Sequence, residues 1–298
     1  MPFFGRAPWA VSLHGGHSSN YCDHGTSTLR EILDAAVAVG YRTFGVTEHA
    51  ARNESRFLYP EEIKRGWDVA KIQRDFEAYA AVTQSLAEEY AGRLNVLRGF
   101  EAEVVPANRY APLMLELRER FRFDYMVGSV HWVDDRITDY SQESFDAVLE
   151  TYPSLDALAV CYYERVAEMV RALRPEVVGH IDVIRKYARP HGSVDTPAIR
   201  DAADGALEAI RDARTIIDVN TSAYRRGLDT PYPAPWLLER AVRHFGIGVC
   251  FGDDSHGVAQ VGAGILEARA YLLEHGVAYL STLERSDAGV VQTAVALI

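Results

Sequence analysis

Histidine and carboxylate side chains recur along this chain at the ends of short apolar runs. The series comprises His14, His17, Glu48, His49, Glu101, His131, His180, Asn220, Asp254 and His256, with His24 in the first loop. A lone histidine in such a place is usually a structural hydrogen-bonding residue, but here histidines end one apolar run after another, as in GSVH and VVGH. Imidazole nitrogens combined with carboxylate oxygens are the ligands that Zn, Mn and Fe sites require. The series therefore predicts a site for such cations.

Two carboxylates of the series are candidates to bridge cations, which lowers the repulsion between neighbouring metal ions. Glu101 and Asp254 are the first choices. Glu103 lies on the same strand face as Glu101, and Asp253 adjoins Asp254, so either assignment could shift to its neighbour. The spacing Asp-x-His from Asp254 to His256 places both side chains on one side of an extended segment, which favours Asp254.

The remaining histidines and the nearby cysteine are interpreted as structural. His244 lies within a helical pattern, His275 precedes a glycine at the expected end of a helix, and His191 lies in a loop. Cys22 lies between His17 and His24. A thiolate ligand is one interpretation of Cys22, and an ordinary buried cysteine is the favoured one.

The elements that would position these groups are strands alternating with helices. Seven β-rich runs are expected as strands, at 9–13, 43–47, 94–100, 125–130, 177–181, 215–219 and 247–251. The segments between them read as helices, for example Thr28–Val39, closed by Gly40. This order favours an α/β barrel of parallel strands over an open doubly wound sheet. In a barrel the C-terminal ends of all strands open onto one mouth, where the series would converge.

The length and composition indicate one folded domain. The 298 residues fit a single barrel over residues 1–298, because no linker marks a boundary. The longest segments between strands, 51–93 and 134–175, are each large enough for two helices and a surface excursion. No apolar run is long enough for a membrane span, and three widely spaced cysteines fit reduced thiols. We expect a cytoplasmic protein without a membrane partner, whose oligomeric state the sequence does not indicate.

The net charge limits the partners. At a formal charge of -11 the chain should repel nucleic acid and other polyanions unless a local patch reverses the field. An anionic substrate therefore needs concentrated local positive charge. Bound divalent cations would supply it.

A set of longer motifs follows the same order along nearly the whole chain. They are HSSNYCDHGT from His17, VTEH ending at His49, FLYPEE from Phe57, GFEAE around Glu101, GSVH ending at His131, VVGHID around His180, NTSAYRR from Asn220 and GDDSHGVAQVG around Asp254. Each motif alone is weak, but together they are specific. The chain resembles the polymerase and histidinol phosphatase (PHP) superfamily, and within it the histidinol-phosphatase branch.

The resemblance implies a distorted seven-stranded (β/α)7 TIM-like barrel with a trinuclear metal centre. It implies two to three divalent cations, Zn, Mn or Fe, held as follows: His14, His17, Glu101 and Asp254 on one; Glu101 as a bridge, His131 and His180 on a second; His24, His49 and His256 on a third. One departure concerns the family's opening H-x-H, which is H-G-G-H from His14 to His17 here. The two glycines would allow a β-bulge that restores the facing of the two histidines.

The activity that the resemblance implies is hydrolysis of a small phosphomonoester, with L-histidinol phosphate as the first choice. The expected catalytic residues are Asp254, Glu101, His131 and Arg226, and the expected substrate-binding residues are Arg225, Arg226, Lys186 and Asn220. Glu48 is expected to orient a ligand histidine from the outer shell. Acidic loops around Glu48, Glu103 and Asp253 are expected to accept the ammonium and imidazole of the substrate.

Two other functions would use the same residues. One is a phosphoesterase acting on another phosphomonoester or on a DNA 3′-end. The acidic charge and the dispersed basic residues argue against nucleic acid. The other is a metal-binding module without catalysis, which a measurement of phosphomonoester turnover would distinguish.

Overall fold

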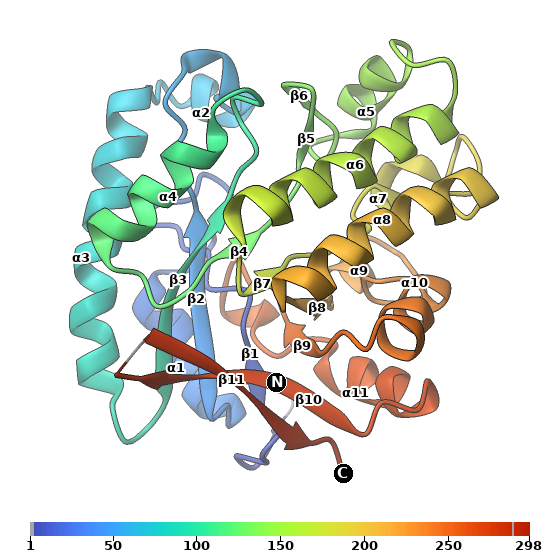
Figure 1. Cartoon of the computed structure of the whole chain (residues 1–298). Helices are drawn as coiled ribbons and strands as arrows, with labels where there is room; N and C mark the ends of the chain where they lie inside the picture. The colour runs from blue at the N-terminus through green and yellow to red at the C-terminus, as the bar shows by residue number, and fades with distance from the viewer. Residues whose placement is uncertain (1–2, 288) are drawn as a thin grey trace.

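The computed structural model describes residues 3–287 and 289–298 (Figure 1). Within these residues, parallel strands form a seven-stranded sheet in the order β1-β2-β3-β4-β7-β8-β9. Their bounds are Val11–Ser12 for β1, Thr43–His49 for β2, Asn95–Ala102 for β3, Val127–Gly128 for β4, Val177–Val178 for β7, Ile216–Asn220 for β8 and Val249–Gly252 for β9. Every strand lies within or overlaps a run predicted from the sequence. Several are shorter than predicted.

The sheet closes on itself at its first and last strands. The amide of Leu13 donates to the carbonyl of Phe251 at 2.8 Å, and the amide of Asp254 donates to the carbonyl of His14 at 2.9 Å. These bonds join the end of β1 to the end of β9. The fold is therefore a distorted, nearly closed α/β barrel, as predicted, and the alternative of an open doubly wound sheet is wrong.

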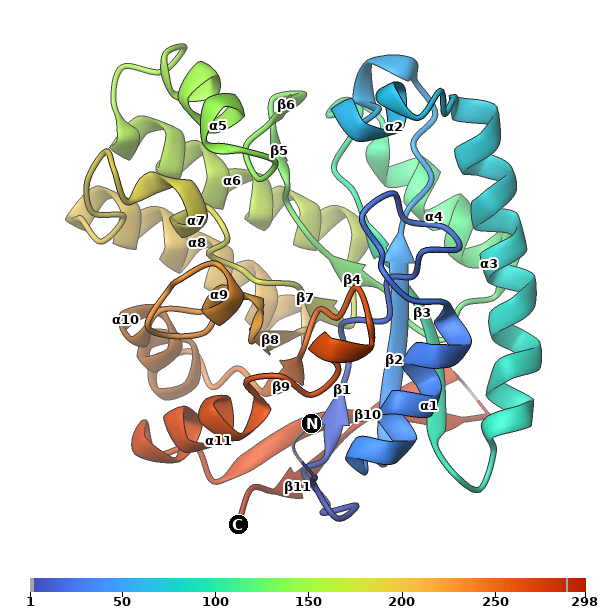
Figure 2. The same ribbon diagram turned by 180° about the vertical axis from the view of Figure 1, so that it is seen from behind.

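Helices cover the outside of the barrel (Figures 1 and 2). The longer ones are α1 (Leu29–Val39), α3 (Val69–Tyr90), α4 (Tyr110–Phe121), α6 (Leu155–Leu173), α8 (Pro197–Ala213) and α11 (Ile265–Glu274). The predicted helix before Gly40 is confirmed as α1, with a capping box at Thr28 and Gly40 as a left-handed C-cap at φ 92°. Within residues 3–287 and 289–298, no helix is both long and apolar enough to span a membrane.

Shorter elements complete the fold, most of them near the mouth of the barrel, whereas α10 (Pro235–Glu239) lies on its outer side (Figure 2). They are α2 (Pro60–Lys64), the hairpin of β5 (Trp132–Val133) and β6 (Arg136–Ile137), α5 (Gln142–Leu149), α7 (Arg185–Ala188), α9 (Ser222–Arg225) and α10, with 3-10 turns at Ser55–Phe57 and Val258–Gln260 and a π-helical segment at Arg240–His244. The two long segments between strands hold two helices each, as predicted: α2 and α3 in the first, α5 and α6 in the second.

The interior of the barrel is a packed core beneath the mouth. It contains Val11, Leu13, Leu97, Tyr125, Val127, Val177, Ile216, Cys250 and Leu283, all buried. Tyr125 crosses the interior and donates its hydroxyl to the carbonyl of Leu13 at 2.7 Å. A side chain at Gly45 would place its Cβ within 1.8 Å of this hydroxyl, so only glycine fits there. The solid interior confines any ligand to the mouth.

A C-terminal antiparallel hairpin, absent from the strands predicted above, closes the opposite end of the barrel. It pairs β10 (Tyr279–Ser286) with β11 (Gly289–Ala296) and lies across the lower end of the barrel in Figure 1. Leu283 of β10 completes the interior core, and Arg285 pairs with Asp124 at 2.6 Å. The β-branched residues of β11, Val290, Val291, Thr293 and Val295, were the signal for this strand in the sequence.

Candidate metal centre

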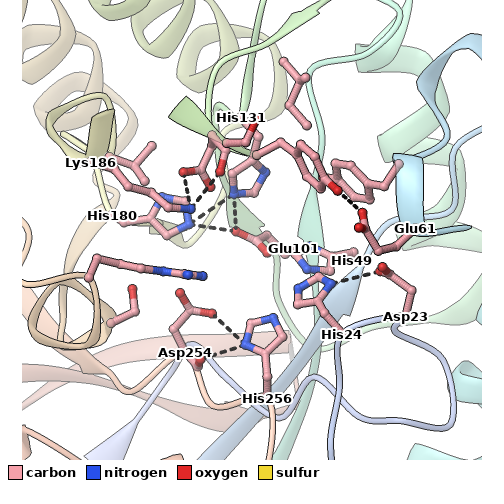
Figure 3. Close-up of a pocket in the computed structure, with 18 of the residues that line it drawn as sticks. Asp23, His24, His49, Glu61, Glu101, His131, His180, Lys186, Asp254 and His256 are labelled. Atoms are coloured by element: carbon pink, nitrogen blue, oxygen red, sulfur yellow. Dashed lines mark hydrogen bonds and ion pairs between the residues drawn. The ribbon is translucent and has the colours of Figure 1, made fainter. Parts of the chain in front are cut away.

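The C-terminal ends of the strands surround a cavity of about 360 Å³ (Figure 3). Its lining includes Asp23, His24, His49, Tyr59, Glu61, Glu101, His131, Asp139, Tyr140, His180, Lys186, Arg226, Tyr232, Asp254 and His256. The volume is in the range of small-molecule sites. Residues predicted from strand ends spread over the whole chain therefore meet in one place.

Glu101, at the end of β3, lies at the centre of the cluster. Its Oε1 is 3.1 Å from Nε2 of His180, 3.3 Å from Nε2 of His14 and 3.5 Å from Nε2 of His131. Its Oε2 is 2.9 Å from Nδ1 of His49. One carboxylate thus faces imidazoles from several strands, which is the position that a bridging ligand requires.

The possible ligand atoms fall into overlapping groups in which all atoms lie within 4.8 Å of one another. The groups are His14, His17 and Glu101; His17, Asp254 and His256; Glu101, His131 and His180; and Cys22, His24, His49 and His256. Every residue of the predicted ligand sets belongs to one of them. Two features differ from the prediction: Cys22 joins the third set, and Asp254 groups with His256 as well as with His17.

His14 points into the site despite the H-x-x-H spacing. Gly16 adopts φ 79°, a left-handed conformation that glycine accepts without strain. The amide of Gly16 donates to the carbonyl of Ser255 at 3.1 Å, which ties this turn to the loop after β9. The turn directs both His14 and His17 toward Glu101, as the expected bulge would.

Carboxylates behind the imidazoles orient the ligand candidates. Nδ1 of His14 is 2.7 Å from Asp218, Nδ1 of His131 is 2.8 Å from Glu103, and Nδ1 of His24 is 2.9 Å from Asp23. Such partners fix the tautomer and the direction of the opposite nitrogen. Glu48 lies farther from Nδ1 of His17, at 3.5 Å, and makes no hydrogen bond to it. Sequence reasoning suggested this function for Glu48 and missed Asp218, although Asp218 lies on the same face of β8 as Asn220.

Several buried nitrogens at the site make no hydrogen bond to the described residues, although carboxylates lie near some of them. They include Nε2 of His14, both ring nitrogens of His17 and Nε2 of His49 and His256. A buried polar atom without a hydrogen bond is costly, and a neutral imidazole nitrogen is a good ligand for a borderline cation. The donor set therefore fits divalent metal ions.

The electrostatics of the protein without cations are dominated by imidazole and carboxylate contacts. Burial raises the pKa of Glu101, but the facing imidazoles of His14 and His131 outweigh it and hold that pKa well below its usual value. Burial lowers the pKa of His131, yet the charges of Glu103 and Glu101 outweigh it and raise the pKa to about 9. Protons thus occupy positions that cations would take.

The surroundings of Asp253 and Asp254 distinguish the two neighbouring carboxylates. Asp253 is fully buried and accepts hydrogen bonds from the hydroxyl of Tyr41 at 2.9 Å and the amide of Gly262 at 2.8 Å. Asp254 instead faces His17 at 3.5 Å, with its backbone at φ 48°. Neither Asp253 nor Glu103 belongs to the cavity lining, so they are not the substrate acceptors that the sequence suggested; Glu48, also buried, is not in the lining either.

The basic residues divide into two groups. Arg226 and Lys186 line the cavity, as a phosphate-binding role requires, and Lys186 pairs with Asp139 at 2.7 Å. Arg225 does not line it, because its guanidinium donates to the carbonyl of Asp254 at 2.8 Å. Asn220 is fully buried and donates to Asp218 at 2.9 Å. Arg225 and Asn220 thus contact Asp254 and Asp218 and do not line the cavity; their direct binding of substrate stays a prediction.

The histidines and the cysteine that the sequence analysis interpreted as structural have different surroundings. His191 pairs with Asp146 at 2.7 Å, and Nδ1 of His275 lies 2.8 Å from the carbonyl of Tyr271. Cys22 differs, because its Sγ lies 3.3 Å from Nδ1 of His24. Burial alone would raise the pKa of this thiol, but contacts with His24, His256 and His49 lower it well below its usual value. The two interpretations of Cys22 from the sequence, an ordinary buried cysteine and a thiolate ligand, stay predictions; the thiol is buried and lies beside possible ligand nitrogens.

The barrel and this cluster belong to a recognised class. The family model of the PHP domain matches residues 14–222, and the chain belongs to the PHP domain family. Histidinol-phosphatase of Saccharomyces cerevisiae is 30% identical over 309 residues, covering 92% of this chain and 92% of that protein.

Solved structures share the fold. A Listeria monocytogenes protein assigned as a histidinol phosphatase superposes with a TM-score of 0.76 at 21% identity, covering 86% of this chain and 99% of that one. Histidinol phosphate phosphatase of Lactococcus lactis, solved with Zn, L-histidinol and phosphate, gives a TM-score of 0.68 at 20% identity, covering 91% and 95%. At these identities the likeness supports the fold alone.

Proposed function

We propose that this chain is a metal-dependent phosphomonoesterase that hydrolyses L-histidinol phosphate to L-histidinol and phosphate. The observation that carries the proposal is the placement of Glu101 among imidazoles of four segments, beside a cavity that Arg226 and Lys186 also line. The 30% identity to the yeast histidinol-phosphatase over nearly the whole chain supports the choice of substrate.

The ligand residues would be His14, His17, His24, His49, Glu101, His131, His180, Asp254 and His256, holding two to three cations of Zn, Mn or Fe. Bound divalent cations supply activation of water and neutralisation of phosphoryl charge. Glu101 and Asp254 would hold the cations beside the phosphate of the substrate. Glu103 orients His131 toward Glu101. No residue nucleophile is needed.

The phosphate of the substrate would bind toward Arg226. Its guanidinium can present two N–H groups to two phosphoryl oxygens, which a point charge cannot. Lys186 is already paired with Asp139 at 2.7 Å, so part of its charge is neutralised. We therefore assign the larger contribution to phosphate binding to Arg226 and a supporting one to Lys186.

The organic part of the substrate would extend toward Glu61, in place of the buried acceptors suggested by the sequence. Glu61 lines the cavity and accepts a hydrogen bond from the hydroxyl of Tyr140. Other lining carboxylates already face cationic or imidazole partners: Asp23 faces His24, and Asp139 faces Lys186. Glu61 is thus the lining acid best placed to accept an ammonium or an imidazole N–H.

A panel of phosphomonoesters tests this function. Assayed with Mn, Zn, Fe and Co, the protein should hydrolyse L-histidinol phosphate with a kcat/KM about a hundredfold above that for p-nitrophenyl phosphate and simple sugar phosphates, about 2.7 kcal/mol of transition-state stabilisation. Equal rates across the panel, or a preference for a DNA 3′-end, would reject the substrate. Complete absence of turnover would favour a binding module. A cytoplasmic location and the absence of nucleic-acid partners stay predictions.

A further inference from the structure

We propose that Cys22 is a thiolate ligand of the third metal site and makes this site selective for zinc over manganese. The inference rests on the proposed metal-dependent function and deepens it. The resemblance assigned three imidazoles to this site and no sulfur, so the thiolate changes both the number and the chemical softness of its ligands.

The geometry places the thiol among the imidazoles of the site. Sγ of Cys22 and one nitrogen each of His24, His49 and His256 all lie within 4.8 Å of one another. Cys22 is 5% exposed, so its sulfur faces this group and not solvent. Nε2 of His49 and of His256 has no hydrogen-bond partner among residues 3–287 and 289–298 and is buried. Four donors around one point satisfy a tetrahedral cation.

Backbone contacts hold the four donors together. Cys22 and His24 lie on the loop after β1, where the amide of Cys22 donates to the carbonyl of Ser18 at 2.8 Å. The same loop reaches the segment of His256, because the amide of Thr26 donates to the carbonyl of His256 at 2.7 Å. His49 ends β2. The site is therefore built on joined segments and not on a free loop.

The chemistry of the donors separates this site from its neighbours. The two groups centred on Glu101 offer imidazole and carboxylate, which suit Zn, Mn and Fe alike. A thiolate is a soft ligand that favours Zn over Mn, whose preferred donors are oxygens. Zinc binding to the Cys22 thiolate forms one Zn–S bond, and any proton shared between the sulfur and the neighbouring imidazoles passes to solvent, with no change of oxidation state. The chain would thus bind mixed metals when both are supplied.

Cobalt substitution tests the sulfur directly. The full-length protein is stripped of metal, loaded with Co(II), and examined for the near-ultraviolet absorption of thiolate-to-cobalt charge transfer. We expect this band in the wild type and in Cys161→Ala, whose half-exposed thiol lies outside the groups of ligand atoms. We expect its loss in Cys22→Ser, together with a fall of at least about tenfold in zinc affinity at one site per chain.

The outcomes are distinct. A wild-type cobalt protein that binds metal and turns over substrate without the charge-transfer band overturns the inference and leaves the proposed function intact. A protein that binds no cobalt and no zinc overturns both. Should Cys22→Ser fail to fold, the wild-type spectrum and its persistence in Cys161→Ala still decide the assignment. Equal zinc content in Cys22→Ser and wild type after growth in excess manganese would also contradict it.

Discussion

Oδ2 of Asp218 lies 2.7 Å from Nδ1 of His14, and both side chains are fully buried. Asp218 also accepts a hydrogen bond from Asn220 at 2.9 Å. The contact directs the opposite nitrogen of His14 to Glu101 at 3.3 Å. A carboxylate one layer behind the ligands thus fixes the histidine whose sequence spacing departs from the family pattern.

Asp218→Asn should weaken metal binding while leaving the fold intact. The amide is of similar size but cannot stabilise the donating imidazole with a charge, so we expect a loss of about ten- to a hundredfold in metal affinity or turnover. Metal titration of the stripped protein measures it. Asp212→Asn, an exposed change on α8, is the matched control. Unchanged affinity in Asp218→Asn would show that His14 needs no such partner.

Loss of single ligand candidates should abolish most of the activity. We expect His131→Ala, His180→Ala and Asp254→Asn each to cost at least about a hundredfold in turnover, because each removes a contact to the shared centre. His244→Ala, at an exposed position, should keep wild-type rates. Circular dichroism checks that the fold survives. If His14→Ala alone proved neutral, His14 would leave the ligand set and the others would remain.

Metal uptake should strengthen as the pH rises from 7 to 9. The pKa of His131 is about 9 without cations, because the charges of Glu103 and Glu101 outweigh burial, so this imidazole holds a proton at pH 7. A cation that binds to this imidazole must displace that proton. The affinity for the metal ion should therefore rise by about tenfold per pH unit for each proton released. Burial lowers the pKa of His256 to about 4, so this group contributes nothing in that range. Calorimetry in buffers of different ionisation enthalpy counts the protons; uptake independent of pH would contradict the argument.

Removal of the metals should abolish activity reversibly and lower stability. The purified protein is expected to carry more than one transition-metal ion per chain by elemental analysis. A ligand at a hundred times its dissociation constant stabilises the native state by about 2.7 kcal/mol, so the stripped protein should melt at a lower temperature. Readdition of Zn or Mn should restore both properties. A metal-free preparation with full activity would end the proposal.

Two substitutions in the cavity should separate phosphate binding from recognition of the organic group. Arg226→Glu should lower kcat/KM for every phosphate ester, because it repels the group that all of them share. Glu61→Gln should lower it by about tenfold for L-histidinol phosphate and little for p-nitrophenyl phosphate, since only the former presents an ammonium and an imidazole. Glu143→Gln, exposed on α5, controls for the loss of an acid. An equal fall in kcat/KM for both substrates in Glu61→Gln would show that Glu61 does not recognise the organic group.

The sequence by itself determined the barrel and most of the candidate centre. Apolar runs of strand length locate the parallel strands, and a barrel brings their C-terminal ends to one mouth, so side chains such as Glu101 and His180 could be placed together without coordinates. The glycines between His14 and His17 likewise indicated a turn that restores the facing.

Only the tertiary structure decided which atoms face one another. Asn220 and Arg225 follow β8 as phosphate-binding residues would, but their side chains bind Asp218 and the carbonyl of Asp254. Cys22 reads as an ordinary buried cysteine until the loop after β1 folds against His49 and His256. Local patterns fix the position of a residue along its element, whereas side-chain direction and partners depend on segments far away in the chain, which meet only when the barrel closes.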